Sequence, residues 1–273
     1  MHDDRQGGRR DAGVLYYAIG AQYLDEAAIS ARSVRDRMPG LPLALITDQS
    51  PPENLFDMVF PPEDGLGFKA QKMAALKRSP FEKTLYLDTD TYMAAPVPEL
   101  FEALDDYDMA MALSARQRQT DRRRGTPDCA PMWNSGVIAY CRSAPVMTLL
   151  DAWLDMHGDD NGQDQPSLRH AMYERGLRCL PLPARYNFKF DFPQSLTHDA
   201  KILHGRHPEL DALAGRLRAD GHVVVHLPVS FLSRMRVLGK KTPRPRVSEL
   251  LKQGLKILAG GPDKTARNRQ TGS

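Results

Sequence analysis

The stretch Lys83-Thr84-Leu85-Tyr86-Leu87-Asp88-Thr89-Asp90-Thr91-Tyr92-Met93 decides the fold. Its first half is a run of β-forming residues, which predicts a buried strand that ends at Asp88. Two acids, Asp88 and Asp90, follow at the carboxyl end of that strand, where open α/β sheets bind their ligands. Neighbouring ionised carboxylates repel each other unless a cation neutralises them, and oxygen ligands suit Mg²⁺ or Mn²⁺. The stretch therefore predicts an α/β sheet with a divalent-cation site at this strand end.

The patterns around this stretch alternate between strands and helices. Residues 13–20 are predicted as a first strand, 23–38 as an amphipathic helix and 41–47 as a second strand, which together open a parallel unit. The other predicted elements are strands at 58–60, 108–113, 133–140, 178–182, 201–205 and 223–225, helices at 67–76, 99–104, 146–157 and 208–219, and a helix that opens at 163–168. This order predicts a Rossmann-like α/β fold with a mixed, mainly parallel sheet flanked by helices.

The composition is typical of a soluble globular protein. At 273 residues the chain is long enough for one large domain with a full core. Cys129, Cys141 and Cys179 are widely spaced and form no CxxC pair, so they indicate neither a zinc site nor a disulfide framework. The polar start lacks the apolar core of a secretory signal, and no apolar run is long enough to span a bilayer. We therefore expect a cytoplasmic enzyme.

Charge is unevenly distributed along the chain. The net charge is +3, yet from Arg234 onward eleven Lys or Arg residues face only two acids, Glu249 and Asp263. A mildly acidic body with a strongly basic tail indicates that the tail, and not the fold, meets an anionic surface. An anionic membrane is one hypothesis for that surface, and we expect no nucleic-acid partner.

Three segments are predicted: a flexible N-terminus at 1–12, a domain at 13–233 and a basic tail at 234–273. In the tail, residues 247–258 are predicted as an amphipathic helix, and the residues after it as disordered. A basic amphipathic helix lies on an anionic membrane surface or packs onto the body of the protein. The first alternative would place the protein peripherally on the inner face of the membrane.

Two further segments carry clustered positive charge. Lys69 and Lys72 lie near the start of the helix predicted at 67–76, where the helix dipole disfavours cations. A phosphate-bearing ligand would account for them, and ordinary solvation is the alternative. Between Ser114 and Ala130 the chain loses its periodicity and carries five arginines. This segment is predicted to be a loop, either a lid over phosphates or a solvated surface loop.

Four motifs in this order resemble the GT-A glycosyltransferases, the nucleotide-diphospho-sugar transferases, and most nearly those of family 8. The motifs are Leu85-Tyr86-Leu87-Asp88-Thr89-Asp90, Asn134-Ser135-Gly136-Val137-Ile138, Asp164-Gln165 and Ile202-Leu203-His204-Gly205, and the resemblance covers roughly 14–204. It implies a metal-dependent transferase domain at 13–233 that moves a hexosyl group from a nucleotide sugar, with a UDP-sugar as the expected donor. The acceptor would be a glycan or a lipid-linked sugar of bacterial surface-glycan synthesis.

The resemblance also implies a metal site. Asp88 and Asp90 would hold Mn²⁺ or Mg²⁺ against the donor diphosphate, and His204 looks like the third ligand, with His207 as its rival. The chain departs from the family pattern after His204, because the lysine expected there is absent. Arg206 or His207 would take the place of that lysine at the phosphates.

Other site residues follow from the same resemblance. Asn134, Ser135 and Gly136 would contact the donor sugar, with Gly136 allowing close approach of the backbone. Asp164 and Gln165 would lie beside the anomeric carbon, although a helix cap is an alternative role for Asp164.

The family favours retention of the anomeric configuration, whereas an inverting enzyme would need a carboxylate base, for which Asp191 or Asp164 would serve. In the opening strand the acid common in the family is missing, but Tyr23 would stack on the base and Asp48 would reach the base or ribose. Core packing is the alternative role for Tyr23.

Two other functions remain open from the sequence. A haloacid-dehalogenase-type phosphohydrolase also has an Asp-x-Asp pair after an apolar strand, and Asp88 would then be its nucleophile. Such enzymes usually carry the pair on their first strand, whereas at least two predicted strands precede it here. A non-catalytic nucleotide-sugar-binding module would bind the nucleotide with metal but show no turnover.

Overall fold

The computed structural model describes residues 10–114, 125–157, 164–190, 192, 194–217 and 224–226. The chain divides into two compact units, Met1–Pro228 and Val229–Ser273, and all described residues belong to the first. The predicted tail helix at 247–258 and the arginines between 116 and 124 lie outside the described residues.

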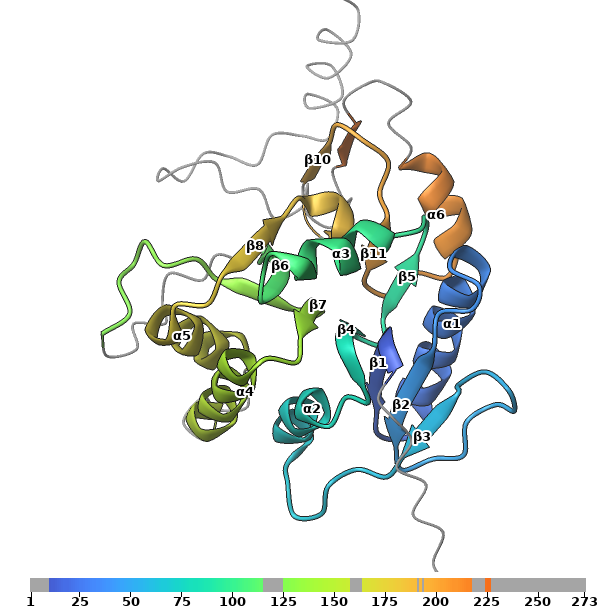
Figure 1. Cartoon of the computed structure of the whole chain (residues 1–273). Helices are drawn as coiled ribbons and strands as arrows, with labels where there is room; N and C mark the ends of the chain where they lie inside the picture. The colour runs from blue at the N-terminus through green and yellow to red at the C-terminus, as the bar shows by residue number, and fades with distance from the viewer. Residues whose placement is uncertain are drawn as a thin grey trace, which may run out of the picture. The chain divides into compact units, whose positions relative to one another are not determined.

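A seven-stranded sheet forms the centre of the described structure (Figure 1). Its strand order is β3-β2-β1-β4-β7-β6-β8. Neighbouring strands pair in parallel except where β7 pairs antiparallel with β4 and with β6. The strands are β1 (Arg10–Ala18), β2 (Leu43–Thr47), β3 (Met58–Phe60), β4 (Phe81–Leu87), β6 (Met109–Leu113), β7 (Trp133–Cys141) and β8 (Cys179–Leu182). The predicted mixed, mainly parallel sheet is therefore confirmed.

Helices pack on both faces of this sheet. One face packs against α1 (Ala21–Arg37) and α3 (Pro98–Glu102), which a 3-10 turn, η1 (Ala103–Asp105), extends. The other face packs against α2 (Phe68–Lys77), α4 (Ala144–His157) and α5 (Gln165–Arg175). Alternate residues of β1 supply the two cores, since Val14 and Tyr16 face one side and Leu15 and Tyr17 the other.

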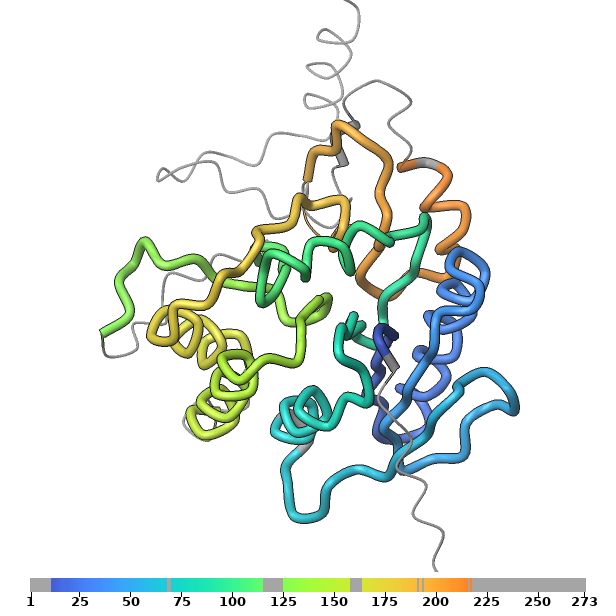
Figure 2. The backbone as a smooth tube through the Cα atoms, in the orientation of Figure 1, coloured from blue at the N-terminus to red at the C-terminus, as the bar shows by residue number. Residues whose placement is uncertain are grey.

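A second, smaller sheet holds the segment that follows the two acids. It has the order β5-β11-β9, from β5 (Thr91–Met93), β11 (Ile202–His204) and β9 (Phe188–Lys189). Figure 2 shows β11 beside β5, although the two are far apart in the sequence. Tyr92, Phe188 and Leu203 pack in a third core with α6 (Leu210–Arg216). The remaining elements are η2 (Ala184–Tyr186) and an antiparallel pair, β10 (Gln194–Leu196) and β12 (Val224–His226).

The predicted bounds of most elements lie within a few residues of the observed ones, but three short strands were not predicted. The first strand begins at Arg10, three residues before its predicted start and inside the segment predicted to be flexible. The missed strands are β5, β9 and β10, which have two or three residues each. Strands of this length have no readable alternation, because their pairing depends on contacts with distant segments.

Candidate active site

The two acids lie between the carboxyl end of β4 and the small sheet. Asp88 directly follows β4, and Asp90 directly precedes β5. β11 pairs antiparallel with β5 so that His204 lies opposite Thr91, and the Gly205 N–H donates to the Asp90 carbonyl oxygen over 2.8 Å. The pairing of β5 with β11 therefore brings the histidine to the acids.

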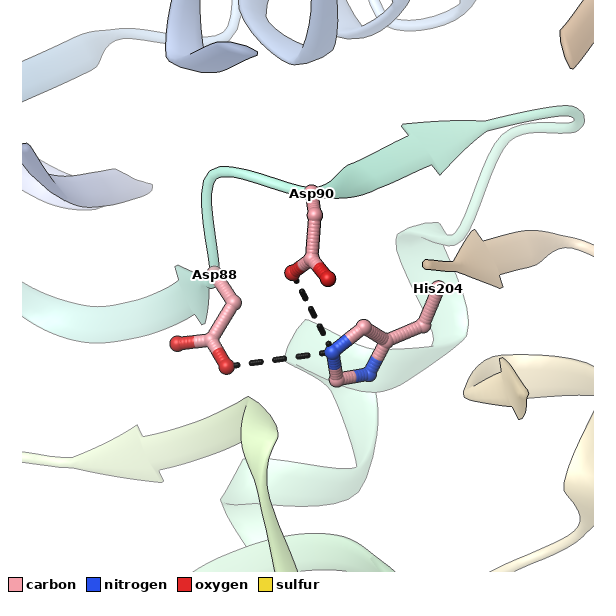
Figure 3. A group of neighbouring side chains, drawn as sticks. All are labelled: Asp88, Asp90 and His204. Carbon is pink, nitrogen blue, oxygen red and sulfur yellow. Dashed lines mark ion pairs between the residues drawn. The ribbon is translucent and has the colours of Figure 1, made fainter. Parts of the chain in front are cut away.

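Asp88, Asp90 and His204 form a compact group of possible metal ligands (Figure 3). One ligand atom from each lies within 4.8 Å of the others. Nε2 of His204 is 3.3 Å from Oδ1 of Asp90 and 3.8 Å from Oδ2 of Asp88. Two carboxylates and one imidazole suit Mn²⁺ or Mg²⁺, and the remaining coordination positions would be left for a ligand. The three residues expected at the cation site are thus together, and their chemistry fits a divalent cation.

A chain of amide groups holds the imidazole in place. Nδ1 of His204 lies 2.7 Å from Oδ1 of Asn187, which accepts its proton. Nδ2 of Asn187 donates to Oδ1 of Asn134 over 2.8 Å, and that oxygen also accepts from the Gly136 N–H over 2.9 Å. A proton fixed on Nδ1 leaves Nε2 facing the acids, where it either carries a second proton or presents its lone pair to a cation.

Gly136 is in contact with the candidate ligands themselves. A Cβ at this position would lie 2.1 Å from Cε1 of His204 and 2.7 Å from Oδ2 of Asp88. The sequence predicted that Gly136 allows the backbone to approach a sugar. The structure shows that the space beside its Cα is filled by the acid and the histidine, so only glycine fits here without displacing them.

Lys72 contacts two of the predicted site acids, Asp88 and Asp164. Its ammonium group lies 2.9 Å from Oδ1 of Asp88 and 3.5 Å from Oδ2 of Asp164, and Ser135 donates to the same Asp164 oxygen over 2.7 Å. The hydroxyl of Tyr86 donates to Oδ1 of Asp88 over 2.8 Å. Lys72 is buried, so its position near the start of α2 is explained by these carboxylates and not by solvation.

Two pKa values reflect these contacts. Burial alone would lower the pKa of Lys72, but the charges of Asp88 and Asp164 raise it above its usual value. Burial alone would raise the pKa of Asp90, but the hydrogen bond and charge of His204 hold it well below its usual value, with help from Lys189 and Arg206. The lysine is therefore charged and Asp90 is ionised at neutral pH.

Asp164 occupies the N-cap position of α5 but does not cap it through its side chain. The carboxylate instead turns to Lys72 and Ser135, while the Asp164 carbonyl oxygen accepts from Nε1 of Trp153 over 2.8 Å. The cap alternative is therefore wrong. Gln165, the first residue of α5, is half-buried and has no hydrogen bond to another described side chain. Asp191 lies outside the described residues.

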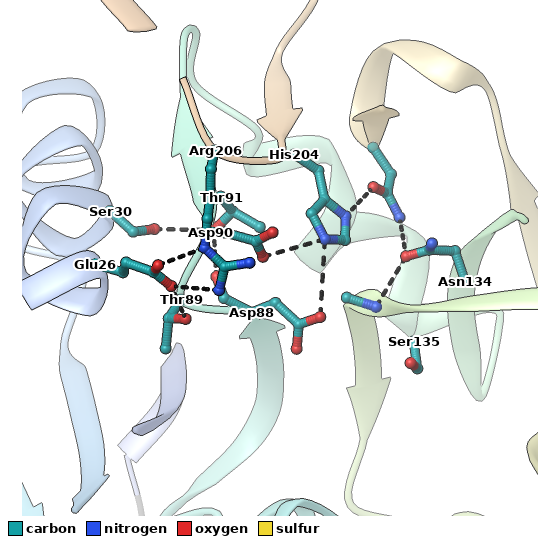
Figure 4. A network of polar contacts seen from close by, with 12 residues as sticks. Glu26, Ser30, Asp88, Thr89, Asp90, Thr91, Asn134, Ser135, His204 and Arg206 are labelled. Carbon is teal, nitrogen blue, oxygen red and sulfur yellow. Dashed lines mark hydrogen bonds and ion pairs between the residues drawn. The ribbon is translucent and has the colours of Figure 1, made fainter. Parts of the chain in front are cut away.

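Arg206 forms an ion pair with Glu26 at the edge of the site (Figure 4). Its Nε and Nη2 donate to the two carboxylate oxygens of Glu26 over 2.6 and 3.1 Å, and Thr89 donates to the same carboxylate. His207 does not join the cluster, because its Nδ1 accepts from the Glu209 N–H over 3.0 Å. Of the two histidines, only His204 lies close enough to Asp88 and Asp90 to be the third metal ligand.

Comparison with known proteins gives matches among solved structures alone. No protein-family model matches the sequence, and no curated protein does. The glycosyltransferase GlyE of Streptococcus pneumoniae TIGR4 matches with a TM-score of 0.52 and 15% identity over 77% of this chain and 60% of GlyE. An active-site mutant of LgtC matches with a TM-score of 0.52 and 14% identity over 82% of this chain and all of LgtC. The bifunctional glycosyltransferase WbbM matches with a TM-score of 0.50 and 10% identity over 72% of this chain and 46% of WbbM.

The chain has the GT-A glycosyltransferase fold. The predicted resemblance is thereby confirmed for the fold.

On this GT-A sheet the residues expected at the base lie beyond β1 and β2. Oδ1 of Asp48 accepts from the Gly20 N–H over 2.8 Å, which lowers the pKa of the Asp48 carboxyl. Tyr23 lies in α1. Burial raises the pKa of Tyr17 most, and the charge of Asp48 raises it further. Tyr23 is partly buried against the core on the α1 face of the sheet, whereas Tyr17 belongs to the core on the other face, so the structure supports the core-packing alternative for Tyr23. Lys69 lies in α2, but its side chain is outside the description.

Sequence reasoning missed Asn187, Tyr86 and Glu26. Asn187 orients the candidate histidine, but it precedes a two-residue strand and belongs to no motif. Tyr86 falls inside the predicted strand, and its hydroxyl donates a hydrogen bond to Asp88. Its position two residues before the acid placed both side chains on one face of the strand, and this spacing was the available signal. Glu26 pairs with an arginine far away in the sequence, so no local pattern marks it.

Proposed function

We propose that this protein is a metal-dependent glycosyltransferase that moves a hexosyl group from a nucleotide-diphosphate sugar to an acceptor hydroxyl. The observation that carries this proposal is the Asp88–Asp90–His204 group at the carboxyl end of β4 in a GT-A fold. A UDP-sugar is the proposed donor, with Tyr23 and Asp48 at the base. Mn²⁺ or Mg²⁺ held by the three side chains would neutralise the charge that collects on the leaving diphosphate.

Side chains around the Asp88–Asp90–His204 group would position the reacting sugar. The acceptor oxygen forms a bond to the anomeric carbon as the bond from that carbon to the diphosphate oxygen breaks. The electron pair of the broken bond leaves with the diphosphate, and the acceptor proton passes to that oxygen or to a carboxylate. In this proposal Asn134, Ser135 and Asp164 contact sugar hydroxyls, Lys72 holds the Asp164 carboxylate in place, and Gln165 faces the developing positive charge.

Retention of the anomeric configuration is proposed from the likeness to family 8. An inverting reaction would use Asp164 or Asp191 as its base. The carboxylate of Asp164 is already engaged by Lys72 and Ser135. The GT-A fold also argues against the phosphohydrolase hypothesis, as does the position of β4 in the middle of the sheet after three earlier strands.

A thermal-shift panel tests the donor part of the proposal. Nucleoside diphosphates at about 100 times their dissociation constant should stabilise the protein by about 2.7 kcal/mol, which is a shift of several degrees. We expect UDP to give the largest shift, and only with Mn²⁺ or Mg²⁺. If no nucleotide stabilises the protein with either metal, the proposal is wrong. Metal-dependent binding without turnover of any UDP-sugar, by hydrolysis or transfer, would instead favour the non-catalytic module.

The acceptor is proposed to be a glycan or lipid-linked sugar of bacterial surface-glycan synthesis, met at the inner face of the membrane through the basic tail. The support is the charge of residues 234–273. Among the described helices, none is long and apolar enough to cross a bilayer. Liposomes that contain anionic lipid should bind the full chain more strongly than a chain lacking residues 240–273. Equal partitioning of the two would overturn this part.

A further inference from the structure

A cavity of about 350 Å³ lies beside the candidate metal centre. Asn134 and Asn187, the two amides that hold His204, form part of its wall. Apolar side chains of β6 and β8, among them Ala112 and Leu182, line it together with Lys189 and Gln194. Amide groups beside small apolar side chains suit the hydroxyls and the apolar faces of a sugar ring. The cavity therefore opens beside the place where the proposed transfer occurs.

The order of strands places this cavity on the side away from the proposed nucleotide. Asp48 and Tyr23 follow β2 and β1, which lie on one side of β4 in the sheet. The cavity is lined from β6 and β8, which lie on the other side of β4. With the diphosphate at the end of β4, the donor nucleotide and the cavity flank the metal centre from opposite sides. An acceptor would enter from the cavity side.

Lys189 gives this cavity a charge. Of the described residues that line it, Lys189 alone is charged. It is half-buried, and β9 places it in register beside His204 of β11. Among the described residues its ammonium group makes no hydrogen bond or ion pair, whereas Lys72, Lys83 and Lys201 each make one. Its charge acts on Asp90 only at longer range, where it helps to lower the pKa of that acid. A partly buried cation that touches no anion gains stability from an anion that pairs with it directly.

We propose that Lys189 makes this cavity a subsite for an acidic acceptor, a sugar that carries a carboxylate or phosphate group. This inference rests on the proposed function, which supplies the transfer. The ammonium group pairs with the acid of the acceptor, while Asn134, Asn187 and Gln194 surround the ring. A neutral sugar of the same shape would leave Lys189 unpaired, so the cavity discriminates by charge. The donor diphosphate is the other possible source of the anion, and the experiment separates the two.

The experiment measures binding of matched sugars to the full chain by saturation-transfer NMR and calorimetry. The probes are methyl glucuronide with methyl glucoside, methyl galacturonide with methyl galactoside, and glucose 6-phosphate with glucose. Each pair is measured with Mn²⁺ and UDP and without them. The variants are Lys189→Gln, Lys189→Arg and, as a control, Lys77→Gln, which removes the same charge from a lysine paired with Asp151. We expect at least one acidic probe to bind wild type about tenfold or more tightly than its neutral partner.

Each outcome decides the proposal. Lys189→Gln should abolish the preference for the acid, Lys189→Arg should keep it, Lys77→Gln should not change it, and UDP binding should be the same in all four proteins. If wild type prefers no acidic probe, or if Lys189→Gln keeps the preference, the proposal is overturned. If Lys189→Gln instead weakens UDP binding, the lysine serves the donor and the proposal is wrong. Failure of the proposed function is distinct, because it appears as absence of metal-dependent UDP binding in wild type.

Discussion

Gly136→Ala tests how tightly the metal site is built. The added carbon would lie 2.1 Å from Cε1 of His204 and 2.7 Å from Oδ2 of Asp88. Since apolar contacts settle near 3.5 Å, the imidazole must move by roughly 1.4 Å or the strand must shift. A functional site tolerates displacements of only about 0.5 Å, and disturbing the groups that support metal ligands typically costs about 10- to 100-fold in metal affinity. We expect a loss of at least that size, with overpacking destabilising the metal-free fold by about 1–3 kcal/mol.

Calorimetry of Mn²⁺ binding is the assay, after circular dichroism has shown that the variant is folded. Gly215→Ala is the matched control, because a Cβ there meets nothing within 4 Å and its backbone has no positive φ. In a His204→Ala background, Gly136→Ala should cause much less further loss, because the ring it displaces is gone. A folded Gly136→Ala protein that binds Mn²⁺ like wild type would refute the reasoning.

Three further outcomes are expected. Asn187→Leu removes the acceptor that holds Nδ1 of His204, so calorimetry should show about 10- to 100-fold weaker Mn²⁺ binding, and an unchanged affinity would mean that the amide does not orient the ring. Lys72→Met leaves Asp88 and Asp164 without their cation, so urea unfolding should show a loss of about 2–3 kcal/mol. An equally stable variant would contradict a buried, charged lysine. Asp90 has a lowered folded-state pKa, so its contribution to metal-free stability is complete above its unfolded pKa of about 4 and is lost as pH falls below that value. The stability difference between wild type and Asp90→Asn should therefore shrink as pH falls from about 5 to about 2. A difference that grows over this range would reverse the sign we assign.

The sequence predicted those parts of the fold that local patterns determine. The strand before Asp88 was readable because Leu85, Tyr86 and Leu87 are a continuous run of β-formers, and such runs mark strands covered on both faces. The helix at α1 was readable because its apolar residues recur at helical spacing. Strand order and the antiparallel direction of β7 are set by contacts between distant segments, so no local pattern gives them.

The candidate site divides in the same way. Asp88 and Asp90 can be predicted from the sequence because two like charges at a buried strand end require a cation. His204 was found only through its resemblance to a motif, and its position beside the acids depends on the pairing of β5 with β11, two strands of three residues each. Asn187 could not be found, because an amide that orients another side chain leaves no periodicity and no charge pattern. The ion pair between Lys72 and Asp164 was missed although both residues were named, since the spacing of residues does not show which side chains meet.

The most direct test of the central claim is a crystal structure with Mn²⁺ and UDP, with anomalous differences recorded at the manganese absorption edge. The account predicts one strong peak with Asp88, Asp90 and Nε2 of His204 as ligands at about 2.0–2.4 Å, and a diphosphate oxygen on its open side. UDP bound in the crystal without a manganese peak between these three side chains, or with manganese held by other residues, would contradict it.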